Sequence, residues 1–128
     1  MKNKFRAWDG GSAARMYTSS EVMVCDGDIW IFDEDSDSNE WIVNNDLSLM
    51  QSTGLFDKND KEIFEGDIVK MAKNVYSEPT YYEVVRHRGG AYRLESKQHG
   101  CELWLRHTDC EIAGNVHANP ELLEVQDL

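Results

Sequence analysis

The sequence predicts a mainly β fold, either all-β or α+β, and three observations lead to this prediction. Short runs of β-branched and aromatic residues recur along the whole chain of 128 residues. Turn signals such as Asp26 and Gly27 separate several of these runs. A clear helix start occurs only near the end, at Asn119 and Pro120. We therefore expect an N-terminal β-meander over residues 1–48, packed with an SH3-like small β-barrel over residues 49–128 that ends in a short helix.

The first half of the chain is predicted to be a meander of short strands. Gly10 and Gly11 favour a hairpin between the first two strands, and Asp26 and Gly27 favour a second one. A polar segment over residues 33–40 is expected to form the acidic tip of a further hairpin. Strands are expected at residues 4–9, 13–17, 22–25, 29–32, 41–43 and 47–50.

Residues 49–70, the central ribbon, organise the rest of the chain. Gly54 is expected to break the apolar run before it, and Gly66 to supply a positive φ angle that other residues resist. Asp57 and Asn59 lie in a polar tip, where their side chains can bond their own backbone. We interpret these residues as backbone devices rather than as a functional site.

The second half is predicted to hold further strands and one helix. Strands are expected at residues 81–85, 91–94 and 111–116, and another apolar run lies at 103–105. Gly114 is expected to form a bulge in the last strand. Asn119 is a candidate N-cap, and Pro120 suits the first helical position because its missing N–H costs nothing there.

The formal net charge of −11 is unevenly distributed. Residues 21–46 include no Lys or Arg, and Asp33, Asp35 and Asp37 mark the centre of an acidic face in this segment. Phosphate binding depends on cationic side chains, so nucleic acid is a disfavoured partner. Two interpretations stay open: a solubilising face, or a surface that docks on a basic partner such as a nucleic-acid-binding protein whose site it covers. The nine acidic residues of the segment are Glu21, Asp26, Asp28, Asp33, Glu34, Asp35, Asp37, Glu40 and Asp46.

The cysteines and the chain start indicate a protein of a reducing cytosol. Cys25, Cys101 and Cys110 form no dense framework, which favours a reducing compartment. Residues 1–9 lack the apolar core of a signal peptide. No run approaches the roughly 20 apolar residues of a membrane span. We expect no membrane association.

The spacing of Asp33, Asp35 and Asp37 is that of the first ligands in a calcium loop. Such a loop needs Gly at its sixth position and a bidentate Glu at its twelfth, and here these are Ser38 and Asn44. We therefore interpret the segment as an acidic hairpin tip and expect no cofactor.

Four potential zinc ligands follow in the second half: His99, Cys101, His107 and Cys110. Their spacing matches no standard zinc knuckle, and whether they meet in space is open. Free cysteines are often small buried hydrophobic residues, which is the alternative. Motifs for an activated nucleophile or a phosphate-binding loop are absent from the sequence. We therefore predict no catalytic residues and no metal.

One basic and aromatic cluster is visible, at Arg86, Arg88, Tyr92 and Arg93. Arg106 is expected in a neighbouring strand. On a small barrel such a face could stack nucleic-acid bases. The alternative is charge balance against the acidic part of the chain, within one chain or across a subunit interface. We regard the cluster as a candidate surface for a ligand or partner.

Five segments stand out by their order and spacing along nearly the whole chain: FRAWD at residues 5–9, MY at 16–17, MQxTGLxDKNxKEIFEGDIV at 50–69, YEVV at 82–85 and IxGNVxxNPELL at 112–123. Together they resemble the YopX family of phage and prophage proteins. This family usually has Gly where the present chain has Asp60, a change that weakens a tight Asn-Gly turn and suggests a longer tip. The resemblance implies a protein of the bacterial host cytosol, where a basic partner would be a host or phage protein.

The resemblance implies a mostly β protein with a barrel-like C-terminal part, and it transfers no catalytic residue. Our leading hypothesis is a non-enzymatic phage accessory protein that acts as a protein-binding or assembly module. The alternatives are a small-barrel nucleic-acid-associated protein and, third, a metal-dependent enzyme. We also expect a homo-oligomer, because four tryptophans are many for so small a chain and some should meet a neighbour: Trp8, Trp30, Trp41 and Trp104.

Overall fold

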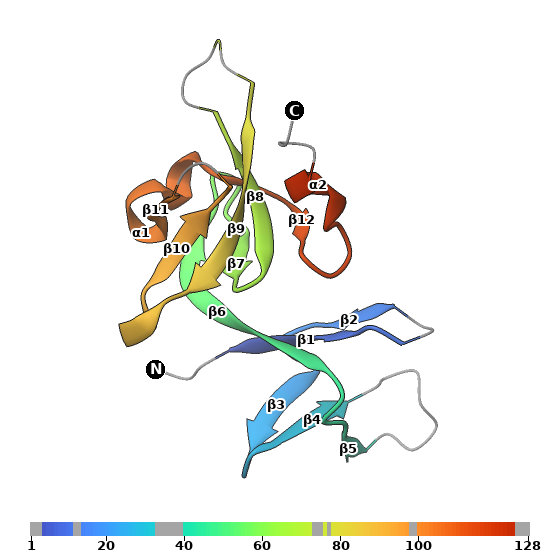
Figure 1. Ribbon diagram of the computed structural model, residues 1–128. Helices are drawn as coiled ribbons and strands as arrows, with labels where there is room; N and C mark the ends of the chain where they lie inside the picture. Colours follow the sequence, from blue (N-terminus) through green and yellow to red (C-terminus); the bar gives the residue numbers. More distant parts are fainter. Residues whose placement is uncertain are drawn as a thin grey trace. The chain divides into compact units, whose positions relative to one another are not determined.

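The computed structural model describes residues 4–11, 14–32, 40–72, 76, 78–97 and 100–124. The chain is mostly β, with curled sheets that form a half-barrel and a short helix near the C-terminus (Figure 1). The prediction of a mainly β fold is thus confirmed. The chain divides into two compact units, Met1–Ser52 and Thr53–Leu128, whereas the sequence placed the boundary between residues 48 and 49.

The N-terminal unit contains two sets of antiparallel strands. Strand β1 (Phe5–Asp9) pairs with β2 (Arg15–Tyr17) and with the first half of β6 (Ser48–Phe56). Strands β3 (Val22–Cys25), β4 (Asp28–Phe32) and β5 (Trp41–Val43) form a three-stranded sheet. The core of the N-terminal unit consists of Ala7, Tyr17, Val22, Ile29, Ile31 and Leu47.

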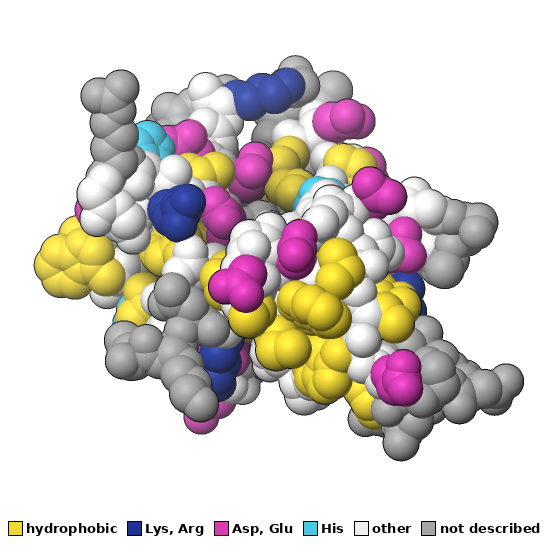
Figure 2. Space-filling model, turned by 90° about the horizontal axis from the view of Figure 1, so that it is seen from below, with side chains coloured by type: hydrophobic (Ala, Val, Ile, Leu, Met, Phe, Trp, Pro, Cys, Tyr) yellow, Lys and Arg dark blue, Asp and Glu magenta, His cyan; other side chains and the backbone are white. Residues whose placement is uncertain are grey.

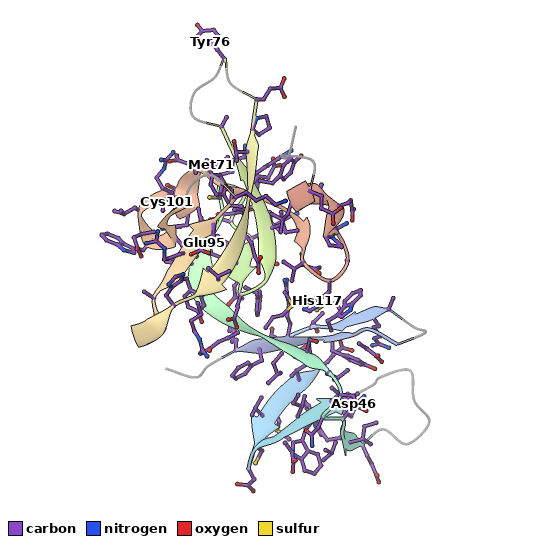
Figure 3. The ribbon with its side chains drawn as sticks, viewed as in Figure 1. Asp46, Met71, Tyr76, Glu95, Cys101 and His117 are labelled. Carbon is purple, nitrogen blue, oxygen red and sulfur yellow. The ribbon has the colours of Figure 1, made fainter. Side chains whose placement is uncertain are left out.

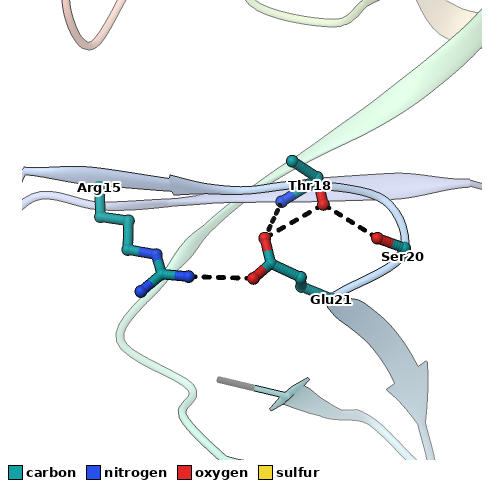
Figure 4. A network of polar contacts seen from close by, with 4 residues as sticks. All are labelled: Arg15, Thr18, Ser20 and Glu21. Carbon is teal, nitrogen blue, oxygen red and sulfur yellow. Dashed lines mark hydrogen bonds and ion pairs between the residues drawn. The ribbon is translucent and has the colours of Figure 1, made fainter. Parts of the chain in front are cut away.

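The connection from β2 to β3 is fixed by the carboxylate of Glu21 (Figure 4). Its Oε1 accepts hydrogen bonds from the backbone N–H and the hydroxyl of Thr18, at 3.0 and 3.1 Å. Its Oε2 lies 2.9 Å from a guanidinium nitrogen of Arg15. The backbone bond from Thr18 is the main reason why the pKa of Glu21 is lowered.

The C-terminal unit is built on a five-stranded antiparallel sheet in the order β11-β10-β9-β8-β12. The unit also contains the second half of β6 and strand β7 (Glu62–Phe64). The sheet strands are β8 (Asp67–Met71), β9 (Thr80–Arg86), β10 (Tyr92–Glu95), β11 (Gly100–Glu102) and β12 (Glu111–Asn115). The helical turns are η1 (Arg88–Gly90), α1 (Leu103–Arg106), η2 (His107–Asp109) and α2 (Glu121–Glu124). The buried core consists of Ile63, Val69, Met71, Tyr82, Val84, Leu94, Leu103 and Cys110.

The central ribbon differs from its prediction at Gly54. Strand β6 does not end there but continues to Phe56, and Gly54 has a φ of 76° inside it. The hydroxyl of Thr53 donates to the carbonyl of Ile63 at 2.7 Å and thereby holds β6 to β7 beside this glycine. Gly66 has the predicted positive φ, 88°. A glycine therefore bends the strand instead of breaking it.

The tip of the ribbon is tight rather than long. The backbone N–H of Asp60 donates to the carbonyl of Asp57 at 3.0 Å, and Asp60 adopts a φ of 61°. This is the left-handed conformation that a glycine would take at the same place. Asp is one of the few other residues that tolerate it, so the turn keeps its shape without glycine.

The apolar run after β11 is a helical turn and not a strand. Helix α1 buries Leu103 completely, while Trp104 is 63% exposed. Arg106 ends this helix, so the expectation that it lies in a neighbouring strand is wrong. A run of three apolar residues is too short to show whether its spacing is that of a helix or of a strand. The sequence therefore did not indicate that only Leu103 of this run would be buried.

The bulge predicted at Gly114 is present, because the register of β12 against β8 shifts between Ile112 and Gly114. The side-chain Oδ1 of Asn119 accepts a hydrogen bond from the backbone N–H of Asn115 at 3.3 Å. A Cβ at position 114 would lie only 2.4 Å from this oxygen. Close approach of Asn119 to the strand therefore requires glycine there.

Candidate functional site

The predicted basic and aromatic cluster lies on the hairpin of β9 and β10. Arg86 and Tyr92 are directly opposite each other in this hairpin. Arg93 forms an ion pair with Glu102 on β11, and its Nε lies 3.8 Å from Oε1 of Glu95. Arg93 is thus neutralised within its own sheet.

Acidic side chains lie on the same face of this hairpin as Arg93, whereas Arg86 and Tyr92 lie on the opposite face. Glu95, labelled in Figure 3, lies with its Oε1 2.7 Å from Nε2 of His87. Glu83 is directly opposite Glu95 in the hairpin. Burial raises the pKa of Glu83, and the charge of Glu95 raises it further. The surface is therefore of mixed charge and is poorly suited to a phosphate backbone.

Tyr92 packs against the hydrophobic core of the C-terminal unit, and burial raises the pKa of its hydroxyl. The side chain of Arg88 lies outside the described residues. This arrangement supports charge balance inside the chain as the role of the cluster, rather than base stacking.

The potential zinc ligands do not form a site in the part of the chain that the structure describes. The Sγ of Cys110 donates to the carbonyl of Arg106 at 3.3 Å, and burial is the main reason why the pKa of Cys110 is raised to about 12. Nδ1 of His107 lies 2.7 Å from the carbonyl oxygen of Phe56. Cys101, labelled in Figure 3, packs against the core. Among the described residues, no three side chains of the metal-binding types lie close enough to hold a metal ion. His99 lies outside the described residues.

The acidic face predicted at Asp33, Asp35 and Asp37 lies outside the described residues. Two other acids, Asp57 and Asp67, are buried with 3% and 1% exposure. An oxygen of Asp67 accepts the backbone N–H of Phe64 at 2.8 Å, and Asp57 accepts backbone N–H groups as well. Both carboxylates therefore satisfy backbone donors in turns, as the sequence predicted for the central ribbon.

A different feature is exposed on the three-stranded sheet of the N-terminal unit. Side chains alternate between the two faces of a strand. Val22, Ile29 and Ile31 point to the buried core. The register places other apolar residues on the opposite face, here called the apolar face: Met23, Trp30, Phe32, Trp41 and Val43. Val24 and Ile42 share the side of Val22, Ile29 and Ile31 but are 41% and 49% exposed, so the core covers that side only in part.

The apolar face is accessible to a partner. Met23, Trp41 and Val43 are 42%, 38% and 44% exposed. The rings of Phe32 and Trp41 pack at a tilt, with centroids 5.7 Å apart. Figure 2 shows hydrophobic side chains gathered on one side of the molecule, with Asp and Glu side chains at the border. Exposed apolar side chains that lie together are a common feature of interaction surfaces.

The sequence contains a signal for this face, which the prediction of the individual strands did not take into account. The runs at residues 22–24, 29–32 and 41–43 are apolar without interruption. A strand with one solvated face would alternate between apolar and polar residues, so an uninterrupted run indicates that both faces are covered. Only the placement of the core shows which face is left over.

The fold and this face define a small, mainly β protein with two buried acids that bind its own backbone and with an exposed apolar sheet face. The family model described as YopX protein matches residues 4–124, and the chain belongs to this family. No curated protein matches the chain. In the described residues, no helix is long and apolar enough to cross a membrane.

Two solved structures are similar to this chain. Protein EF1440 from Enterococcus faecalis is 28% identical, with a TM-score of 0.61, and the alignment covers 96% of the present chain and 99% of that one. Protein yopX from Bacillus subtilis is 19% identical, with a TM-score of 0.67 and the same coverage of 96% and 99%. The second likeness concerns the fold alone.

Proposed function

We propose that this protein is a non-enzymatic protein-binding module that acts as a phage or prophage accessory protein in the bacterial cytosol. The observation that supports this proposal is the apolar face with its exposed Met23, Trp41 and Val43. Phage origin and location follow from the family resemblance and from the composition of the chain. A role in assembly, as a homo-oligomer, belongs to the same proposal.

Trp, Phe and Met are enriched in the cores of protein interfaces, and Trp is frequent among the residues that dominate binding energy. The apolar face contains all three residue types next to one another. The exposed members Met23, Trp41 and Val43 do not belong to the buried core of the unit, so a variant that still folds can be tested for binding. Folding and binding can therefore be separated by mutation.

The test is capture of protein partners from host lysate by immobilised wild type and variants. Trp41→Ser should abolish capture of any specific partner, whereas Trp104→Ser is the matched control, because Trp104 is also exposed but lies on α1. Far-UV circular dichroism checks that both variants are folded. Capture that is equal for wild type and Trp41→Ser, or absent for wild type, would contradict the proposed function.

A further inference from the structure

The border of the apolar face is acidic. Asp28 follows the same alternation as Trp30 and Phe32 and therefore lies on the apolar face itself, at its edge. Asp26 occupies the turn between β3 and β4, and Glu40 directly precedes β5. Both are exposed. Asp28 thus lies on the apolar face, and Asp26 and Glu40 lie close in sequence to its strands.

This acidic border is not neutralised by its own segment. Residues 21–46 contain no Lys or Arg. Glu21 obtains its partner from β2, at Arg15. Asp26 and Glu40 form no ion pair within the part of the chain that the structure describes. Their charges are therefore available to a binding partner.

A second copy of the chain is a poor occupant for this face. In a twofold dimer the same patch is contributed by both copies, so acids at the border would meet acids. Like charges across an interface cost free energy and select against that partner. A partner with cations around an apolar centre meets the opposite situation. Arg in particular can also stack on exposed tryptophan rings such as that of Trp41.

We propose that the apolar face binds a segment of a partner protein whose apolar side chains are flanked by Lys or Arg. This inference rests on the proposed function and adds the chemistry of the partner. The apolar centre supplies the affinity, and the acidic border accelerates encounter and sets the choice of partner.

The experiment is selection from a displayed library of random 16-residue peptides on the immobilised full chain. Peptides that also bind the triple variant Met23→Ser/Trp41→Ser/Val43→Ser are discarded. Of the others, those that still bind the control variant Trp104→Ser are retained. If the triple variant does not fold, Trp41→Ser alone takes its place. We expect the retained peptides to contain apolar residues flanked by Lys or Arg.

A second measurement tests the role of charge. The variant Asp26→Asn/Asp28→Asn/Glu40→Gln keeps the shape of each side chain, and Asn suits the φ of 53° at position 26. Its Kd for a retained peptide should be at least about 3-fold weaker, because each exposed ion pair contributes a factor of roughly 1.5 to 5. The wild-type Kd should also weaken as salt rises.

The outcomes separate the two proposals. Face-dependent peptides without basic residues, or a Kd unchanged in the amide variant, would overturn the inference and leave the proposed function intact. The absence of any face-dependent peptide would overturn both. A wild-type dimer that becomes a monomer with Trp41→Ser would identify a second copy as the occupant, and this also overturns the inference.

Discussion

The backbone N–H of Ile112 donates a hydrogen bond of 3.0 Å to Oδ2 of Asp57, 55 residues earlier in the chain. The other carboxylate oxygen accepts the backbone N–H groups of Asn59 and Lys61 at 2.8 and 2.9 Å. One buried side chain thus closes its own turn and ties it to β12. Burial raises the pKa of Asp57, but the three backbone bonds outweigh this effect, and the net pKa is lowered.

Replacing Asp57 should weaken the C-terminal unit. We expect Asp57→Ala to lower the free energy of unfolding by about 2 to 4 kcal/mol, because buried N–H groups lose charged acceptors. Urea unfolding measures this difference. Asp60→Asn is the control, since Asp60 is an exposed member of the same turn. A loss below about 0.5 kcal/mol for Asp57→Ala, the size of an ordinary surface substitution, would show that the bonds are dispensable.

The stability should fall in acid. The folded-state pKa values of Asp57 and Glu21 are lowered from 3.8 and 4.5. The unfolded chain therefore takes up protons first, so the stabilisation is present above these values and is lost as pH falls through the lower folded-state values. The measurement is the urea midpoint between pH 7 and pH 2.

Two variants test which carboxylates cause this dependence of stability on pH. Glu21→Gln should reduce the slope of stability against pH below about pH 4.5, the ordinary value for Glu21. Glu83 has a raised pKa and acts in the opposite sense, because its protonation in acid relieves repulsion from Glu95. Glu83→Gln should therefore steepen the net loss. An identical pH profile for wild type and Glu21→Gln would contradict the role of the Thr18 and Arg15 contacts.

Position 60 should accept glycine with a gain in stability. Asp60 has a φ of 61°, which costs a residue with a Cβ more than it costs glycine. We expect Asp60→Gly to stabilise the protein by about 0.5 kcal/mol and Asp60→Val to destabilise it by about 1 to 2 kcal/mol. Thermal unfolding of the two variants gives the order. Equal stability of both would refute strain at this position.

Gly114 should not tolerate a side chain. Its added Cβ would approach Asn119 within 2.4 Å at Oδ1 and 2.9 Å at Cβ, so the segment before α2 must move. We expect Gly114→Ala to cost about 1 to 3 kcal/mol, as for other overpacked sites. Hydrogen exchange should show faster opening at Asn115, whose N–H bonds to Asn119. Gly27→Ala is informative as a comparison, because a Cβ there meets nothing within 4 Å and only its φ of 82° is unfavourable.

More than one copy should assemble in solution. Light scattering should give a mass above that of the 14.7 kDa monomer. The mass should be the same for Trp41→Ser, because the acidic border of the apolar face disfavours a second copy there. A monomeric wild type would contradict the expectation drawn from the four tryptophans.

The local features of this chain could be predicted because short-range geometry determines them. Gly66 with its positive φ, the bulge at Gly114 and the tip built on Asp57 all follow from residues close in sequence. The predictions that Gly54 breaks the apolar run and that Arg106 lies in a strand were wrong, because the pairing of β6 with β7 and the burial of Leu103 depend on distant neighbours.

By itself, the sequence determined the mainly β class, the turns and the family, because alternating apolar runs, glycines and Asx residues act over a few positions. Only the tertiary structure decided which partners the charged side chains take, so that Arg93 is paired with Glu102 instead of forming a basic surface. It also decided which side of the strands at residues 22–43 faces the core. Burial is a property of the packed chain, and the apolar face is what that packing leaves in contact with solvent.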